Sequence, residues 1–225
     1  MSVEVFVTGS DVAAMGSDHV ELDCHGLQNT HLDALNHVGI GGTWYGGFSL
    51  DDPDSPSVLD LANAGLMTRA VLADIPSIRG TDWVAPDAPV TGADIAEALA
   101  QAGVAFEPGD ALLLYMGRDR YEAAGHTYDM SAPSPGLGES GVRWIAEHEV
   151  SILCWDFLDA PKTTSPVSTA HSLIWAIGQL LIDSCDFASL RASMPAGGGV
   201  AGALVVAPLA LPHATGANVN PLVIR

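Results

Sequence analysis

Hydrophobic and polar residues follow two different periods along this chain, and each period predicts one kind of element. Short apolar runs that end at glycine, proline or aspartate are typical of buried strands. Such runs predict strands over residues 3–7, 20–22, 70–75, 111–116, 150–155 and 203–207. A predicted turn at residues 9–11 separates the first two strands.

Helices are predicted where apolar residues recur at helical spacing behind a capping residue. Ser57 can cap a helix that runs through residue 64 and ends at Gly65. Thr91 and Asp94 have the spacing of a capping box, with Asp in place of the usual Glu, and predict a helix to residue 102. Further helices are predicted to end near residue 147 and to cover residues 170–181.

Strands and helices alternate in the middle of the chain, whereas both ends are rich in strands. This order predicts an α/β fold with a mixed β-sheet core flanked by helices. Segments 131–138 and 161–169 contain proline and are predicted loops. Because no repeat and no long linker divides the sequence, we expect a single domain over residues 1–225.

Composition narrows the range of partners. The chain has 225 residues, of which 48% are hydrophobic, so it can bury one sizeable core. Its 27 acidic and 8 basic residues give a net charge of −19. Nucleic acids and anionic membranes would be repelled by such a surface, so neither is expected as a partner. The expected partner is a small-molecule substrate that is neutral or held by local cations.

The N-terminus, the apolar runs and the cysteines indicate where in the cell the protein is expected. The first five residues lack the basic and apolar regions of a signal peptide, and no apolar run approaches the roughly 20 residues of a membrane span. Cys24, Cys154 and Cys185 are odd in number and have no zinc-finger spacing, so reduced thiols are expected. We expect a cytoplasmic protein.

Candidate chemistry concentrates in residues 24–37, which contain three of the eight histidines. In an extended segment, residues i and i+2 point to the same side, so His31 and Asp33 would face one point. Imidazole and carboxylate together suit a divalent ion such as zinc or manganese. We therefore predict that His31 and Asp33 are metal ligands. The alternative is a polar loop that happens to be rich in histidine.

Nearby residues can extend this site in more than one way. His37 is either a further ligand or a free base beside the metal ion. The thiolate of Cys24 is another candidate ligand. Neither choice is decided by the spacing of the residues.

Two ligands leave the coordination sphere of a metal ion incomplete, so further ligands must come from a distant part of the chain. His171 lies at the start of a predicted apolar helix, where it can face a cleft. Asp183 follows an apolar run, and a carboxylate buried there must be paired or bound. Both residues are therefore candidates to complete the site. The alternative for Asp183 is a cap on the turn at residues 186–190.

Aromatic and histidine side chains in loops are candidates for substrate binding. Trp44 and Tyr45 lie in the glycine-rich segment 39–47, which lacks the G-x-G-x-x-G pattern and so does not indicate nucleotide binding. They can form a wall over the pocket, and a packed surface loop is the alternative. His126, in another loop, is a third candidate to line the pocket.

The run Thr30-His31-Leu32-Asp33-Ala34-Leu35-Asn36-His37 resembles the signature of the putative cyclase family, roughly His-x-Gly-Thr-His-x-Asp-x-Pro-x-His. That family includes bacterial kynurenine formamidase, isatin hydrolase and cyclases of polyketide pathways. Further stretches resemble the family in the same order along the chain, at residues 65–76, 108–114, 171–187 and 215–221.

The resemblance implies a kynurenine formamidase-like fold and assigns roles to matching positions. His31 and Asp33 match metal ligands, and Asp183 stands where the family has a Glu or Gln ligand. His37 matches the histidine usually assigned as general base. His171 matches a ligand or pocket histidine.

The sequence also departs from the family signature. Leu27 stands in place of the first histidine, Asn29 in place of glycine, and Leu35 in place of proline. His25 is near the missing histidine but two residues away from its position. Because this ligand is lost, we expect one divalent ion, zinc or manganese, rather than two.

Together these observations predict an enzyme that acts on carbonyl groups. In the main hypothesis, a metal-activated water and His37 as base hydrolyse a small cyclic amide, formamide or lactone. One alternative is a polyketide-type cyclase, in which the metal polarises a ketone during an aldol-type ring closure. Another is a non-catalytic relative with a degraded metal site. The resemblance also implies a homodimer or higher homo-oligomer.

Overall fold

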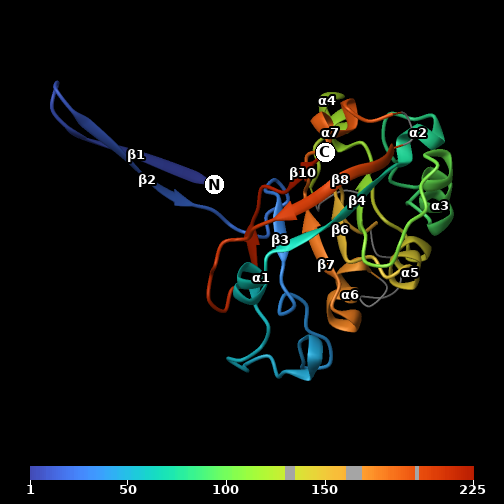
Figure 1. Ribbon diagram of the computed structural model, residues 1–225, viewed down its shortest axis with the longest axis horizontal. Helices are drawn as coiled ribbons and strands as arrows, with labels where there is room; N and C mark the ends of the chain where they lie inside the picture. The colour runs from blue at the N-terminus through green and yellow to red at the C-terminus, as the bar shows by residue number, and fades with distance from the viewer. Residues whose placement is uncertain (130–134, 161–168, 196–197) are drawn as a thin grey trace.

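The structure is a computed structural model that describes residues 1–129, 135–160, 169–195 and 198–225. Its centre is an eight-stranded sheet (Figure 1). In spatial order the strands are β10 (Leu222–Ile224), β8 (Gly198–Val206), β4 (Leu66–Asp74), β5 (Ala111–Tyr115), β6 (Ile152–Trp155), β7 (Leu180–Asp183), β3 (His31–Asp33) and β9 (Gly216–Asn218).

The sheet is mixed, as the sequence predicts. Strands β4, β5, β6 and β7 are parallel to one another and form its centre. Strands β8 and β10 on one side, and β3 and β9 on the other, add antiparallel pairs. The central strands β5 and β6 are buried along their whole length, which explains their almost continuous apolar sequence.

Helices cover both faces of this sheet. One face packs against α2 (Ile75–Arg79), α3 (Gly92–Gln101), α5 (Glu139–Glu147) and α6 (Ala170–Ile177). The other face packs against α1 (Val58–Ala64) and the start of α7 (Ala188–Ala192). A further short helix, α4 (Arg118–Ala123), follows β5. In the described parts of the chain, no helix has the length and apolar character to span a membrane. The α/β prediction is confirmed.

Capping residues begin helices where the sequence predicts them. The hydroxyl of Thr91 accepts a hydrogen bond from the Asp94 backbone N–H at 3.2 Å, and the Asp94 carboxylate accepts one from the Thr91 N–H at 2.7 Å. Ser57 and Asp60 form the same reciprocal arrangement at α1. These bonds satisfy backbone donors that a helix start otherwise leaves unpaired.

The predicted helix over residues 170–181 is wrong over its last four residues, 178–181. Helix α6 ends at Ile177, because Gly178 adopts a left-handed conformation (φ 73°) that stops the helix. A Cβ atom at this position would also lie 2.7 Å from Cζ of Tyr45. The apolar residues that follow form β7 instead, and this strand carries Asp183 into the sheet.

Several strand boundaries also differ from the prediction. Strand β4 begins at Leu66 rather than at residue 70, and β8 begins at Gly198 rather than at residue 203. Strands β9 and β10 are too short to give a periodic signal and are not predicted. Of the two predicted proline-containing loops, residues 131–134 and 161–168 lie outside the described residues.

The first residues form a separate hairpin rather than part of the main sheet. Strands β1 (Ser2–Gly9) and β2 (Ala14–Glu21) pair antiparallel with each other in a two-stranded sheet. The hairpin projects away from the body of the molecule (Figure 1). The predicted strand at residues 20–22 is thus the end of a longer strand.

The capping box of α3 gives a test of local stability. Replacing Thr91 by Ala removes one side of the box, so Thr91→Ala should lower the free energy of unfolding by about 1 kcal/mol. Urea denaturation followed by circular dichroism measures this change. Thr81→Ala, an exposed position outside the helices, is the matched control and should have little effect. Equal stability of the two variants would contradict a stabilising role for the cap.

Candidate metal centre

Strand β3 places the first two predicted ligands on one face of the sheet. It pairs antiparallel with β7 on one side and with β9 on the other. In this register His31 lies opposite Asp183, whereas Leu32 lies opposite Ile182 and faces the other way. The alternation predicted from the sequence is therefore present. It brings His31, Asp33 and Asp183 together although the last is about 150 residues away in sequence.

Asp33 lies at the centre of the cluster and is fully buried. Its Oδ1 is 3.0 Å from Nδ1 of His25 and 3.6 Å from Nε2 of His31. Its Oδ2 is 3.7 Å from Nε2 of both His37 and His171. This second oxygen has no hydrogen-bond partner within the described parts of the chain. Each oxygen of one carboxylate therefore faces a different pair of histidines.

His171 is oriented by its position at the start of α6. The carboxylate of Asp159 accepts the Ala170 backbone N–H at 2.8 Å and contacts Nδ1 of His171 at 2.9 Å. This contact turns Nε2 of His171 toward Asp183, 3.2 Å away. Asp159 was not predicted from the sequence, where it is one of many carboxylates that follow a strand.

Asp183 is held from two sides at the end of β7. Its Oδ1 accepts a hydrogen bond from Nε1 of Trp155 at 2.5 Å, and its Oδ2 lies 3.9 Å from Nε2 of His31. The alternative interpretation of Asp183 as a helix cap is wrong, because Asp186 accepts the backbone N–H of Ala188 at the start of α7. Asp183 belongs to the histidine cluster instead.

His25 is the main residue that sequence reasoning left unassigned. Its Nδ1 contacts Asp33, and its Nε2 lies 3.0 Å from the hydroxyl of Thr215. Gly216 makes room for the ring, since a Cβ there would lie 2.6 Å from Cε1 of His25. The signal was the presence of a histidine two residues from Leu27, the position where the family signature has one.

His37 lies at the edge of the cluster and is half-buried. Its ring stacks on that of His25, with centroids 4.1 Å apart and an interplanar angle of 17°. Burial lowers the pKa of His37 below its usual value; His25 and His171 add to this effect and Asp33 opposes it. At neutral pH the imidazole is therefore uncharged and can accept a proton.

His171 and Asp183 shift each other's pKa through the contact between them. Burial disfavours the charged imidazolium of His171, but hydrogen bonds to Asp159 and Asp183 raise its pKa well above the usual value. Burial likewise disfavours the Asp183 carboxylate, but the bond to His171 lowers the pKa of that carboxyl. A metal ion that binds Nε2 of His171 must therefore displace a proton.

The thiol of Cys24 is a poor candidate ligand. Burial, followed by repulsion from Asp33, raises its pKa to about 11. The thiolate, which is the form that binds metal ions, is therefore scarce at neutral pH. Cys24 belongs to neither group of described residues whose ligand atoms all lie within 4.8 Å of one another; Asp183 also lies outside both groups, but its carboxylate is 3.2 Å from Nε2 of His171.

Two overlapping groups of side chains fit a divalent ion. One consists of His25, His31 and Asp33, and the other of Asp33, His37 and His171; in each group the ligand atoms lie within 4.8 Å of one another. Nitrogen and carboxylate oxygen are the donors that zinc and manganese accept. The unpaired buried oxygen of Asp33 is the observation that fits best, because a bound cation would supply the missing partner.

The chain matches the model of one known protein family. Residues 3–160, more than half of the sequence, match the family model described as putative cyclase. The chain belongs to the putative cyclase family. This finding confirms the resemblance noted in the sequence and the prediction that the chain is an enzyme. No match is found among curated proteins.

Several solved structures share the fold of this chain. A crystal structure of a novel cyclase is 20% identical, covers 97% of this chain and 80% of its own, and superposes with a TM-score of 0.77. An isatin hydrolase bound to the product analogue thioisatinate is 19% identical over 98% of this chain and 80% of its own, with a TM-score of 0.64. A predicted metal-dependent hydrolase from Bacillus stearothermophilus is 14% identical over 97% of this chain and 85% of its own, with a TM-score of 0.55. At these identities the likeness concerns the fold.

The three residues predicted to bind substrate lie in two different places in this putative cyclase. Tyr45 packs its ring over Gly178 at the far end of α6 from His171, and Trp44 donates a hydrogen bond to the Leu50 carbonyl at 3.2 Å. This packing resembles the alternative of a packed surface loop. His126 stacks on Tyr121, with ring centroids 4.6 Å apart, at the end of α4. A substrate-binding role for these residues stays a prediction.

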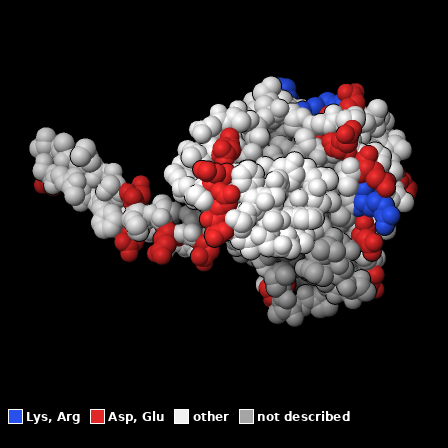
Figure 2. All heavy atoms as spheres, turned by 90° about the horizontal axis from the view of Figure 1, so that it is seen from below, with Lys and Arg blue, Asp and Glu red and all other residues white. Residues whose placement is uncertain are grey.

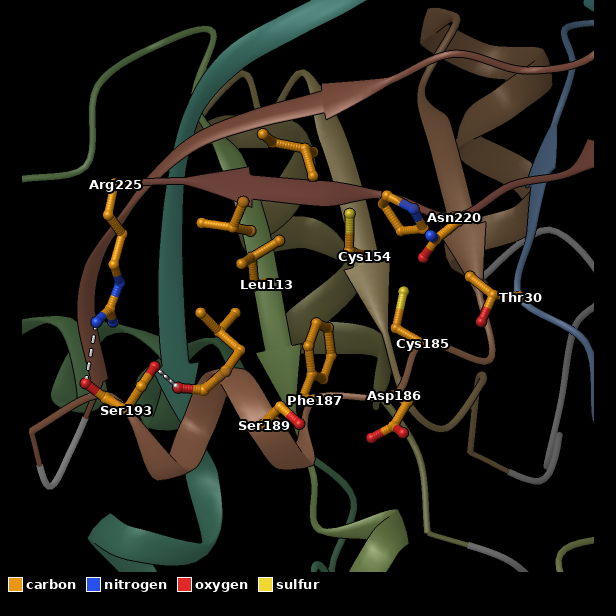
Figure 3. Close-up of a pocket in the computed structure, with 14 residues that line it drawn as sticks. Thr30, Leu113, Cys154, Cys185, Asp186, Phe187, Ser189, Ser193, Asn220 and Arg225 are labelled. Atoms are coloured by element: carbon orange, nitrogen blue, oxygen red, sulfur yellow. Dashed lines mark hydrogen bonds between the residues drawn. The ribbon is translucent and has the colours of Figure 1, made fainter.

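The putative cyclase also has a pocket on the opposite face of the sheet. It has a volume of about 400 Å³, and Figure 3 shows Cys154, Cys185 and Phe187 among its lining residues. Arg225 lies at its rim and donates a hydrogen bond to the Ser193 carbonyl at 3.1 Å. None of the clustered histidines lines this pocket. We therefore place the candidate chemistry at Asp33 and not in this cavity.

Removing the charge of the Asp33 carboxylate should weaken metal binding strongly. Asp33→Asn keeps the size of the side chain but removes its charge, and the expected result is an affinity for zinc or manganese on the order of 100-fold weaker. Isothermal titration with each ion measures this loss. Asp87→Asn, an exposed acid outside the cluster, is the control. Unchanged affinity in Asp33→Asn would contradict the assignment.

The contact between Asp159 and His171 can be tested by a variant that should have a smaller effect on metal binding than Asp33→Asn. Asp159→Asn should weaken metal binding roughly tenfold, because a partner that orients a ligand contributes less than a ligand itself. It should also shift the pH dependence of metal binding, since Asp159 helps to hold the proton on His171. Titrations at several pH values measure both effects. A loss as large as that of Asp33→Asn would instead make Asp159 a ligand.

Proposed function

We propose that this chain is a metal-dependent hydrolase that adds water across the acyl carbon–nitrogen or carbon–oxygen single bond of a small cyclic amide, formamide or lactone. The observation that carries the proposal is the buried carboxylate of Asp33, whose two oxygens face four histidines. Its Oδ2 has no hydrogen-bond partner in the described chain. Membership of the putative cyclase family supports it. The isatin hydrolase with the same fold points to cyclic amides as the first substrates to try.

The ligands in this proposal come from both parts of the cluster. His31, Asp33 and Asp183 would hold a divalent ion, with His25 in place of the missing histidine at Leu27 and His171 beside it. A zinc or manganese ion bound there would activate water and stabilise negative charge on a carbonyl oxygen. Trp155 and Asp159 fix the orientation of Asp183 and His171, so the ligands need little rearrangement when the ion binds.

His37 is the proton acceptor in this proposal. Its lowered pKa keeps the imidazole neutral at the pH of the cell, and its half-buried position leaves one side of the ring reachable from solvent. It takes the proton of the attacking water and returns it to the leaving nitrogen or oxygen. The resulting imidazolium is stabilised by Asp33, 3.7 Å away.

Mass spectrometry of the reaction products tests the type of reaction. The protein, purified without chelator and loaded with zinc or manganese, is incubated separately with isatin, an aryl formamide, an aromatic lactone and a polyketide-like ketone. Hydrolysis adds one water to the substrate mass. Ring closure of a polyketide-like ketone without water uptake would overturn the proposal in favour of a cyclase. Less than about a tenth of an equivalent of bound metal would favour a non-catalytic relative.

A variant of His37 distinguishes a role as general base from a role as metal ligand. His37→Ala should retain bound metal but lower kcat by two to four orders of magnitude, as expected when a general base is lost. Metal analysis and steady-state kinetics on the same sample measure both quantities. His148→Ala is the control, because that histidine bonds the Trp144 carbonyl outside the cluster. Loss of metal in His37→Ala would make His37 a ligand.

A further inference from the structure

Arg225 differs from the other arginines of this acidic chain in having no acidic partner among the described residues. Figure 2 shows the excess of acidic over basic side chains on one face. The six other arginines each form an ion pair with an Asp or Glu, at 2.6–3.5 Å. The Arg225 guanidinium instead donates to two neutral acceptors, the Ser193 carbonyl at 3.1 Å and the sulfur of Met194. Because a guanidinium has five N–H donors, some remain for an anion.

This guanidinium lies at the rim of the pocket of about 400 Å³ on the face of the sheet opposite the histidines (Figure 3). The floor of the pocket is apolar, since Leu113, Leu204 and Phe187 line it and are buried. Pockets of roughly 300–1,000 Å³ with an apolar lining and a few polar groups are typical of small-molecule sites. The floor suits an aromatic ring, and Arg225 at the rim suits a carboxylate attached to that ring.

A side chain of opposite charge lines the other end of the same pocket. Oδ1 of Asp186 accepts the backbone N–H of Ala188 at the start of α7, whereas Ser193, which binds Arg225, lies just beyond the end of this helix. At 1.5 Å per residue, the helical path from residue 186 to residue 193 spans about 10 Å. In Figure 3 Phe187 lies between the two charged groups. The pocket therefore offers a cation and a carboxylate at opposite ends of an apolar floor.

We propose that this pocket binds a small aromatic molecule that carries a carboxylate at one end and an amine at the other. The carboxylate pairs with Arg225 and the amine with Asp186, and the ring between them lies against Leu113 and Phe187. Opposite charges at two fixed points favour one orientation of the ligand and disfavour molecules with two carboxylates or two amines. None of the clustered histidines lines the pocket, so the site is separate from the candidate metal centre. This inference does not depend on the proposed function.

Three matched small molecules test the two ends of the pocket. In para-(aminomethyl)benzoate one ring carries both charged groups at opposite ends, whereas benzoate and benzylamine each lack one of them. The metal-loaded protein should bind para-(aminomethyl)benzoate about fivefold more tightly than either of the other two, because each of them loses one charged contact at a solvent-exposed position. Nuclear magnetic resonance titration of isotope-labelled protein measures the three values of Kd. Equal affinities, or no binding of para-(aminomethyl)benzoate at millimolar concentration, would overturn the proposal.

Variants of the two charged residues assign each contact. Arg225→Gln should weaken binding of para-(aminomethyl)benzoate about fivefold and leave binding of benzylamine unchanged. Asp186→Asn should weaken it by a similar factor and leave binding of benzoate unchanged, and the new amide oxygen can still accept the helix N–H. Arg143→Gln removes an exposed arginine outside the pocket and is the matched control. An Arg225→Gln protein that binds as tightly as the control would contradict the assignment.

Two further variants locate the ligand. Ser189 is an exposed residue of α7 that lines the pocket, so Ser189→Trp should fill the space and abolish binding without disturbing the core. Asp33→Asn alters the candidate metal centre and should leave binding of para-(aminomethyl)benzoate unchanged. Circular dichroism verifies that both variants are folded. Binding that persists in Ser189→Trp, or that is lost in Asp33→Asn, would place the ligand elsewhere and overturn the proposal.

Discussion

The buried carboxylate of Asp33 is the group on which the rest of the site depends. Taking a carboxylate out of water costs several kcal/mol unless nearby groups compensate its charge. Here four histidines surround it, and one oxygen is left without a hydrogen bond in the described chain. Without a cation the arrangement has an electrostatic cost; with one, the same arrangement becomes a set of converging ligands.

This convergence relies on the register of one very short strand. Strand β3 has three residues, and it is held on both sides, by β7 and by β9. A slip of one residue would turn His31 and Asp33 to the face where Leu32 now packs. The two neighbouring strands prevent that slip. Helix α6 then adds His171 from the same face, oriented by Asp159.

Local patterns in the sequence predicted the parts of the site that follow from local geometry. The alternation of His31 and Asp33 is a property of any strand, and the caps at Ser57 and Thr91 depend on residues three positions apart. These predictions needed no knowledge of the tertiary fold. The α/β class followed from the order of the same local elements.

The features that the sequence did not predict depend on tertiary contacts. Trp155 and Asp159 have no distinctive spacing, and they matter because β6 lies beside β7 and leads toward α6. His25 reaches Asp33 because Gly216, far along the chain, leaves space for its ring. The end of α6 at Gly178 was missed because apolar residues on either side of the glycine fit a helix equally well.

The pairing of β3 with β9 also has a consequence for the order of events during synthesis. His31 and Asp33 leave the ribosome well before β9, the strand that flanks them on one side and whose Gly216 makes room for His25. A nascent chain therefore has dispersed histidines and no finished ligand cage until β9 has also been synthesised.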